Sequence, residues 1–141
     1  VSYVFSIYEF TGGANGNTTV DTFTFNKDGR VTIESILNLD DYNDIALSRL
    51  LASKASTELT GNKDMLNDGL GLSYLKTDGR TLDKTKCNCD GFFFGSNLQN
   101  FIIKDEGITF VFSKYQIAPG SYGTPEITVD WESLKPYTIS K

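Results

Sequence analysis

The stretch that decides the fold is GITFVFSKYQIAPGSYGTPEITVDWESL, residues 107–134. Both of its ends alternate apolar with polar or outward-facing positions, the period of two that is typical of β-strands. The alternating apolar residues are Ile108, Phe110, Phe112, Ile127, Val129 and Trp131. The segment between them combines proline, which stiffens the backbone, with glycine, which frees it, and it carries tyrosines. The stretch therefore predicts two strands flanking an irregular loop, and we expect this loop to be the recognition surface.

The N-terminal segment predicts a β-hairpin. Residues 2–10, SYVFSIYEF, place apolar side chains on both faces of an extended strand, so both faces are expected to be at least partly covered. Residues 18–25, TTVDTFTF, alternate cleanly. The intervening TGGANGN offers glycines and asparagines, which form turns; Gly12, Gly13 and Gly16 are expected to be turn formers, as is Gly123 further on. A short third strand is expected from Val31 to Ile33.

The middle of the chain predicts one principal helix, over about residues 41–56. Asp40 or Asp41 can cap its N-terminus, and an apolar stripe follows. The stripe consists of Tyr42, Ile45, Ala46, Leu47, Leu50 and Leu51. A short helical turn is expected at 64–67, a weak strand at 72–75, a strand at 101–103, and a final turn at 133–134 that Pro136 ends. The expected fold is α+β: one mainly antiparallel sheet with the helix packed on one face, in a single domain over residues 1–141.

Composition excludes several classes of function. The chain has 141 residues, and its net charge of −5 argues against nucleic-acid binding, which depends on Lys and Arg. The same charge would attract a basic protein partner. Because no run approaches the ~20 apolar residues of a membrane helix, the domain itself is not expected to span a membrane. The chain begins with Val1 inside an expected strand, so we interpret it as a fragment of a longer secreted or anchored protein.

The residues offer little catalytic chemistry. The chain contains no histidine, which removes His-based triads and the commonest metal ligands. We predict no catalytic residue, no metal and no cofactor. A carboxylate pair for glycoside hydrolysis would have to come from Glu106, Glu126, Asp130 and Glu132, but pairs of acids arise by chance in an acidic chain.

Two further groups of residues have side chains that can bind a metal or undergo redox chemistry. The polar residues Asn62, Asp64, Asn67 and Asp68 lack the spacing of a calcium loop, because Leu66 falls where an oxygen ligand belongs. Cys87 and Cys89 are one residue apart, and a bridge across one residue closes a small, strained ring. We expect two thiols in a surface loop, with a redox-active pair as the alternative.

Two blocks together resemble a known family. GGANGNT at 12–18 and the aromatic-x-IAP-x-x-x-G-x-P pattern within 115–125 resemble the C-terminal extracytoplasmic domain shared by RsiV-type anti-sigma factors and PdaC-type peptidoglycan deacetylases, a domain of unknown function. Three positions depart from the family: Asn15 stands where histidine is usual, Gln116 where an acid is frequent, and Gly120 where an aromatic commonly follows IAP.

The resemblance implies a bacterial domain that faces the cell wall. It implies a non-enzymatic binding or sensor module for a cell-envelope component or a basic protein such as lysozyme. The alternative is an accessory domain beside the catalytic domain of a peptidoglycan deacetylase. Tyr115, Pro119 and Tyr122 are the candidate ligand-binding residues. A structural role is the other interpretation: Tyr115 and Ile117 would continue the strand into the core, and Pro119 would shape the crossover.

Overall fold

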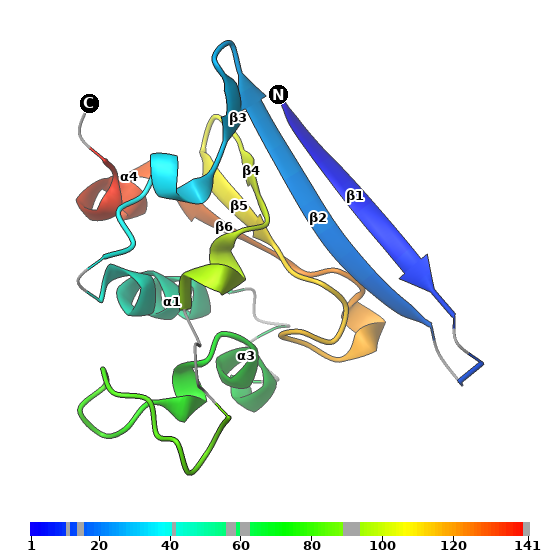
Figure 1. Ribbon diagram of the computed structural model, residues 1–141, viewed down its shortest axis with the longest axis vertical. Coiled ribbons are helices and arrows are strands. Elements are labelled where there is room, and N and C mark those ends of the chain that lie inside the picture. The colour runs from blue at the N-terminus through cyan, green and yellow to red at the C-terminus, as the bar shows by residue number, and fades with distance from the viewer. Residues whose placement is uncertain are drawn as a thin grey trace.

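The computed structural model describes residues 1–10, 12–13, 16–40, 42–55, 59, 63–88 and 94–139. It contains two three-stranded antiparallel sheets and short helices (Figure 1). The first sheet has the order β1 (Ser2–Glu9), β2 (Asn17–Asn26), β3 (Gly29–Val31), and the second β4 (Phe101–Ile103), β5 (Gly107–Val111), β6 (Glu126–Asp130). The α+β class is confirmed. The expectation of one continuous sheet is wrong, since the strands form two.

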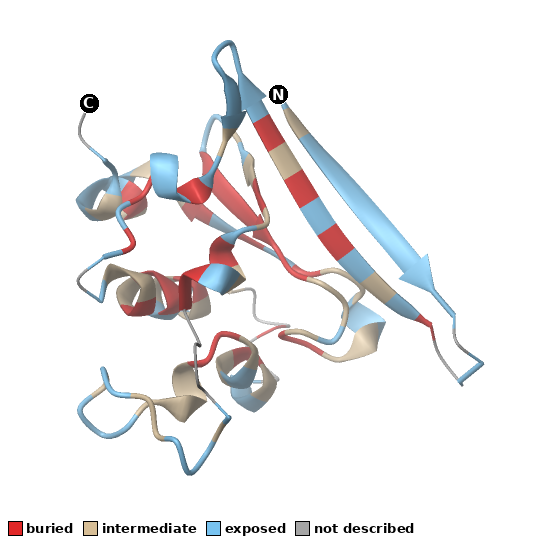
Figure 2. Ribbon diagram, in the orientation of Figure 1, coloured by how far each residue is buried: buried red, intermediate tan, exposed pale blue. Residues whose placement is uncertain are grey.

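The first sheet is a long hairpin with an exposed outer strand. β1 and β2 pair over eight consecutive positions, from Ser2↔Thr24 to Glu9↔Asn17. In β2, Val20, Thr22 and Thr24 are buried at alternate positions, whereas every residue of β1 after Ser2 is exposed (Figure 2). The prediction that both faces of the first strand are covered is therefore wrong. An apolar sequence on both faces does not itself supply a layer to cover it.

Side chains, not a strand ladder, join the two sheets. The Asn100 amide accepts a hydrogen bond from Thr22 N–H at 3.0 Å and donates one to Val20 C=O at 2.8 Å. Val20 N–H donates to Ser113 Oγ at 3.0 Å, and Phe101 N–H donates to Thr22 Oγ1 at 2.7 Å. These bonds satisfy the edge of β2 that faces the second sheet, so that edge needs no further strand.

The second sheet and helix α1 (Asn43–Lys54) enclose the core. All five residues of β5 are buried, and α1 contributes Ile45, Leu47 and Leu51 while contacting β6. In the described part of the chain, the cluster of buried core residues begins at Ile33 and ends at Leu134. It thus takes nothing from β1 or β2, and the hairpin lies beside the core as an arm.

The helices lie where the sequence predicts them, but helix α1 does not have the predicted N-terminal cap. The start of α1 has Tyr42 at the cap position, with φ of 66° and no side-chain cap bond, so Asp40 is not the cap; Asp41 lies outside the described residues. Tyr42 is 56% exposed and does not join the apolar stripe. A second helix, α3 (Lys63–Gly69), confirms the helical turn expected at 64–67.

Three local predictions are wrong. Residues 72–74 form the 3₁₀ helix η2 (Leu72–Tyr74), and Leu75 makes a single bridge with Leu82, so no strand forms there. Trp131 does not extend β6 but begins α4 (Trp131–Leu134), because Asp130 caps that helix by accepting from Ser133 N–H. Pro136 does not end the turn but lies within η5 (Lys135–Tyr137). The remaining 3₁₀ helices are η1 (Ile33–Ser35), η3 (Phe94–Leu98) and η4 (Gly120–Tyr122).

Candidate functional site

The predicted recognition loop lies within residues 112–125, which connect β5 to β6, and this segment has buried and exposed parts. Ile117 and Ala118 are fully buried in the core. Tyr115 and Tyr122 are 42% and 36% exposed. Ile117 lies in the core as the structural interpretation expects, but it does not continue the strand, since β5 ends at Val111. For Tyr115 that interpretation is wrong, because the chain reverses at this residue.

The backbone at Tyr115 is in a conformation that non-glycine residues rarely adopt. Its φ is 71°, in the left-handed region, which costs an L-residue roughly 1–2 kcal/mol. The ring lies directly against Gly120, where a Cβ atom would come within 2.5 Å of it. An aromatic residue at position 120 would therefore displace this ring, which gives a physical reason for glycine after the IAP motif.

The closed end of the hairpin meets this loop. Lys114 N–H donates to Thr18 C=O at 2.9 Å, and Lys114 Nζ donates to Gly16 C=O at 3.2 Å. The Tyr8 ring occupies the space that a side chain at Gly16 would need. Lys114 Nζ also lies 5.1 Å from the centre of the Tyr115 ring, a cation–π distance. Figure 1 shows η4 of the loop next to the end of the β1–β2 hairpin.

We call Tyr8, Lys114 and Tyr115 the tyrosine–lysine cluster. The exposed ring of Tyr8 contacts Gly16, and that of Tyr115 contacts Gly120. The Lys114 ammonium group lies between the hairpin and the loop. Tyrosine offers contact area at low entropic cost, together with a hydroxyl for hydrogen bonds. The arrangement is suited to holding a sugar or peptide on an open surface.

The other predicted residues have supporting places around this cluster. Pro119 is half-buried at the start of η4, and Gly123 ends that helix with φ of 67°. Gly12 adopts φ of 91° in the hairpin turn, as a turn former does. Gly16 instead makes room for Tyr8. Asn15 lies outside the described residues.

Sequence reasoning missed Tyr8 and Lys114. Tyr8 could have been found, because it lies three positions before the glycine-rich turn begins and its hairpin partner Thr18 lies two positions after Gly16. No local signal marks Lys114, because its bond to Gly16 joins residues 98 positions apart. Gln116, the departure from the family's acid, donates to Asn97 Oδ1 and accepts from Ser113 N–H, both at 3.3 Å, so its amide has a structural role.

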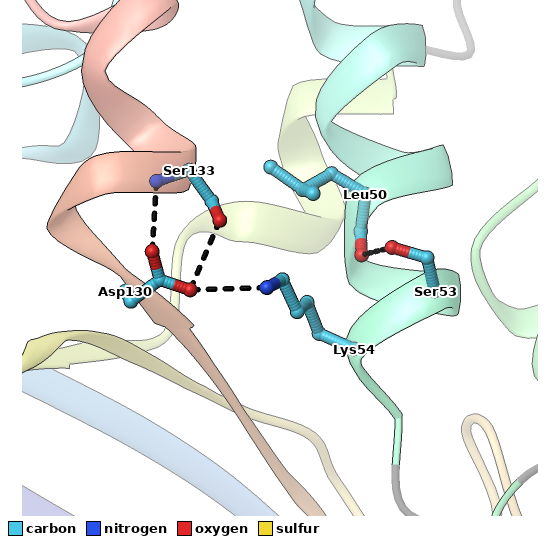
Figure 3. A network of polar contacts seen from close by, with 5 residues as sticks. All are labelled: Leu50, Ser53, Lys54, Asp130 and Ser133. Atoms are coloured by element: carbon cyan, nitrogen blue, oxygen red, sulfur yellow. Dashed lines mark hydrogen bonds and ion pairs between the residues drawn. The ribbon is translucent and has the colours of Figure 1, made fainter.

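Of the four candidate catalytic acids, Asp130 has a structural role. Asp130 caps α4 and pairs with Lys54 Nζ at 3.0 Å, which ties α1 to the end of β6 (Figure 3). The hydrogen bonds from Ser133, followed by that from Lys54, hold the pKa of Asp130 far below its ordinary value. A carboxyl that stays ionised cannot be a general acid. Glu106, Glu126 and Glu132 are exposed.

The acidic residues weighed as a calcium site have other places in the structure. Among the described residues, no group of three or more Cys, Asp and Glu side chains could hold a metal ion. Asp64, Asn67 and Asp68 lie on helix α3, not in a loop, and Asn62 is outside the described residues. A groove of about 540 Å³ is lined by Glu34 and Asp40, among others, and Glu34 accepts from Gln99 Nε2 at 2.7 Å. It lies away from the tyrosine–lysine cluster.

The expectation of two free thiols is wrong for the cysteine that the structure describes. Cys87 is disulfide-bonded. Cys89, the second of the two cysteines, lies outside the described residues.

Comparison with known proteins identifies the family of this chain. The sequence profile of a family described as "Protein of unknown function (DUF3298)" matches residues 46–132. The chain belongs to the DUF3298 family. The match begins within α1 and ends within α4, so it includes the recognition loop and leaves out the β1–β2 arm.

Individual relatives agree with this assignment. The peptidoglycan-N-acetylmuramic acid deacetylase PdaC of Bacillus subtilis is 31% identical over 138 residues, which are 96% of this chain and 25% of that protein. The chain thus spans about a quarter of the length of this relative. Crystal structures of DUF3298 proteins from Bacteroides fragilis and Pseudomonas aeruginosa share the fold, each with a TM-score of 0.60, at 22% and 18% identity. The alignment with the Bacteroides structure covers 99% of this chain and 48% of that one, and the alignment with the Pseudomonas structure covers 98% and 55%.

In the ranges that the structure describes, no helix has the length and apolar character needed to cross a membrane.

Proposed function

We propose that the chain is a non-catalytic, extracytoplasmic binding domain that holds cell-wall glycan beside a catalytic domain outside these residues. The similarity to PdaC supports this proposal, since the name of that protein specifies a peptidoglycan substrate and the matching region is a quarter of its length. Peptidoglycan lies outside the cytoplasmic membrane, so a domain that binds it works there.

The observation that carries the proposal is the tyrosine–lysine cluster. Tyr8 is 65% and Tyr115 42% exposed, yet both rings are positioned by glycine contacts. Rings that are fixed before binding lose little freedom when a sugar packs on them. Lys114 adds a positive charge that suits the carboxylates of wall peptides and muramic acid.

The test is depletion of the chain from solution by purified cell-wall sacculi. Tyr115→Ala and the double variant Tyr8→Ala/Tyr115→Ala are expected to weaken binding about tenfold or more, the effect of losing an aromatic anchor worth 1–2 kcal/mol. The chain offers a matched control. Tyr42 also has positive φ and also lies under a cation, with Arg80 at 5.2 Å, and it is 56% exposed. Tyr42→Ala should bind like the unaltered chain; equal binding by the Tyr115→Ala variant would refute the role of the cluster.

A basic protein such as lysozyme is a second candidate ligand, as for a sensor module. The net charge of −5 favours it, because opposite charges steer association. Binding of this kind should weaken sharply as salt rises, whereas stacking on tyrosine should respond little. Titration with lysozyme at low and high salt separates the two. Absent or salt-independent binding would remove lysozyme as a partner and leave the glycan proposal in place.

A further inference from the structure

The outer edge of β1 has none of the features that usually protect a sheet edge. Proteins keep such edges short, place Lys or Pro on them, or interrupt them with bulges, because unpaired N–H and C=O groups attract another strand. β1 has eight residues paired without interruption to β2, and its single charged residue is Glu9. Five large apolar side chains along it are about half exposed: Tyr3, Val4, Phe5, Ile7 and Tyr8.

The other edge strands that the structure describes are protected. β3 and β4 have three residues each, and β3 carries Arg30. β6 has five residues and carries Glu126 and Asp130 at its ends. β1 therefore differs from them in length, with eight residues against three to five.

The hydrogen-bond pattern shows which groups of β1 are unpaired. Val1 and Phe25 exchange both backbone bonds, N–H to C=O, at 2.8 Å each. In an antiparallel pair, such hydrogen-bonded positions recur at every second residue. The odd-numbered residues of β1 therefore bond to β2, and the N–H and C=O groups of Ser2, Val4, Ser6 and Tyr8 point to the open edge.

We propose that two copies of this chain associate through their β1 strands, antiparallel about a two-fold axis at Phe5. The open-edge groups then pair as Ser2 with Tyr8 of the second copy and Val4 with Ser6, in eight backbone hydrogen bonds. Each pair places a small side chain beside a larger one. Phe5 meets its own copy, at a non-hydrogen-bonded position where side chains come closest.

The exposed apolar side chains of β1 suit such a dimer. Tyr3, Val4, Phe5 and Ile7 are each 45–53% exposed. In the proposed pairing they lie on the two faces of the joined β1 strands, where cross-strand pairs of side chains stabilise a sheet.

Charge does not oppose the association. The chain has a net charge of −5, but β1 and β2 carry one charged residue each, Glu9 and Asp21. With Phe5 at the axis, Glu9 of one copy lies next to Val1 of the other, so the two Glu9 carboxylates are at opposite ends of the pair. A second copy of the same chain is thus the occupant that fits an apolar, nearly uncharged, self-complementary edge.

Sedimentation velocity over a dilution series of the 141-residue chain tests the proposal. The expected result is a species of twice the chain mass of 15.6 kDa that dissociates on dilution. A single species of 15.6 kDa at every concentration would overturn it.

Two charge variants test the register. In the proposed pairing, Tyr3 of one copy lies opposite Ile7 of the other. Tyr3→Lys/Ile7→Glu then places unlike charges together and should still dimerise, whereas Tyr3→Lys/Ile7→Lys loses the same apolar groups, places like charges together and should be monomeric. If both variants are monomeric, or both dimerise equally, the register is wrong.

A proline variant tests whether the backbone edge is used. Ser6 N–H makes no bond to β2, so Ser6→Pro removes an open-edge donor without removing a bond within the chain. It should abolish the dimer and leave the thermal unfolding of the dilute monomer close to that of the Ser6→Ala control, which should dimerise. A Ser6→Pro chain that folds and dimerises like the control would overturn edge pairing.

Discussion

The side chain of Asn100 serves Thr22 as a neighbouring strand would. Its Oδ1 accepts from Thr22 N–H at 3.0 Å, while its Nδ2 donates to Val20 C=O at 2.8 Å. One amide therefore satisfies two backbone groups of β2 and attaches the arm to the second sheet. The bonds between Phe101 and Thr22 and between Ser113 and Val20 reinforce the same joint.

Asn100→Ala should lower the free energy of unfolding by about 2–4 kcal/mol. Two part-buried backbone groups lose their partners, at roughly 1–3 kcal/mol each. In a domain of this size, the Tm should fall by about 10 °C. Asn26→Ala is the matched control, because Asn26 Oδ1 accepts one exposed bond from Asp28 N–H, and it should cost less than about 1 kcal/mol. Thermal denaturation measures both variants. Equal losses of stability would show that Asn100 does not join the arm to the second sheet.

Tyr115→Asn should raise stability while weakening binding to sacculi. Asparagine tolerates the left-handed conformation that Tyr115 adopts at φ of 71°, so up to about 1 kcal/mol of backbone strain is relieved. The ring that would contact the ligand is lost. Tyr42→Asn relieves the same strain at φ of 66° and should leave binding unchanged. Urea denaturation, read with the sacculus assay, checks both; a destabilised Tyr115→Asn chain would mean that contacts of the ring with Gly120 and Lys114 outweigh the strain.

Gly16→Ala and Gly120→Ala should weaken binding with little effect on folding. A Cβ atom at either position meets the ring of Tyr8 or Tyr115, and both rings are exposed enough to move aside. The backbone need not change, because neither glycine has positive φ. Gly29→Ala supplies the opposite pattern: its Cβ would meet nothing within 4 Å, but φ of 126° makes the substitution strained, so stability should fall and binding persist. Unchanged binding by both cluster variants would contradict the idea that glycines position the rings.

Stability should fall as the pH drops below about 4. Hydrogen bonds from the Thr81 side chain and from the Thr81 and Arg80 backbone lower the pKa of Asp78 from 3.8 to about 2, and the pKa of Asp130 is lowered too. A carboxyl with a lowered pKa in the folded state contributes stability that is complete above its ordinary pKa and is lost as the pH falls through the folded value. Urea midpoints from pH 5 to pH 2 measure this decline.

Asp130→Asn should make the acid-induced decline shallower, since one ionisation no longer differs between the folded and unfolded chain. Lys54→Met removes the ion pair but keeps the Ser133 bonds, which are the larger cause of the shift, so it should retain most of the decline. An identical pH profile for Asp130→Asn and the unaltered chain would rule out the contribution of this carboxylate.

Local periodicity was sufficient to predict most of the elements. The alternation in residues 107–134 located β5, the loop and β6, and the apolar stripe located α1 to within two residues at each end. The class and the hairpin also followed. The prediction of one continuous sheet failed because it depends on contacts between distant residues. The two sheets are separate because the side chains of Asn100 and Ser113 replace the hydrogen bonds of a strand ladder. The periodicity of a sequence carries no signal for such contacts.

The candidate site shows the same division. Tyr115 was among the predicted residues because tyrosines in a loop stand out in a sequence. The cluster depends on Gly16, 98 residues before Lys114, and on a left-handed turn at Tyr115, an uncommon conformation that residue type does not predict. The exposed state of β1 was missed for a related reason, because an apolar strand at the edge of a sheet has the same sequence pattern as one inside it.

The joint at Asn100 also determines the order in which the chain can complete its structure during synthesis. The hairpin emerges first, whereas the amide that bonds Thr22 comes 78 residues later and Ser113 comes 93 residues after Val20. Until those residues appear, only the end of β2 that pairs with β3 is covered on its inner edge, and the arm has no core beside it. The nascent arm is therefore most exposed to unwanted strand pairing until residues 100–113 emerge, and a chaperone that recognises extended apolar segments would find its substrate in residues 2–10.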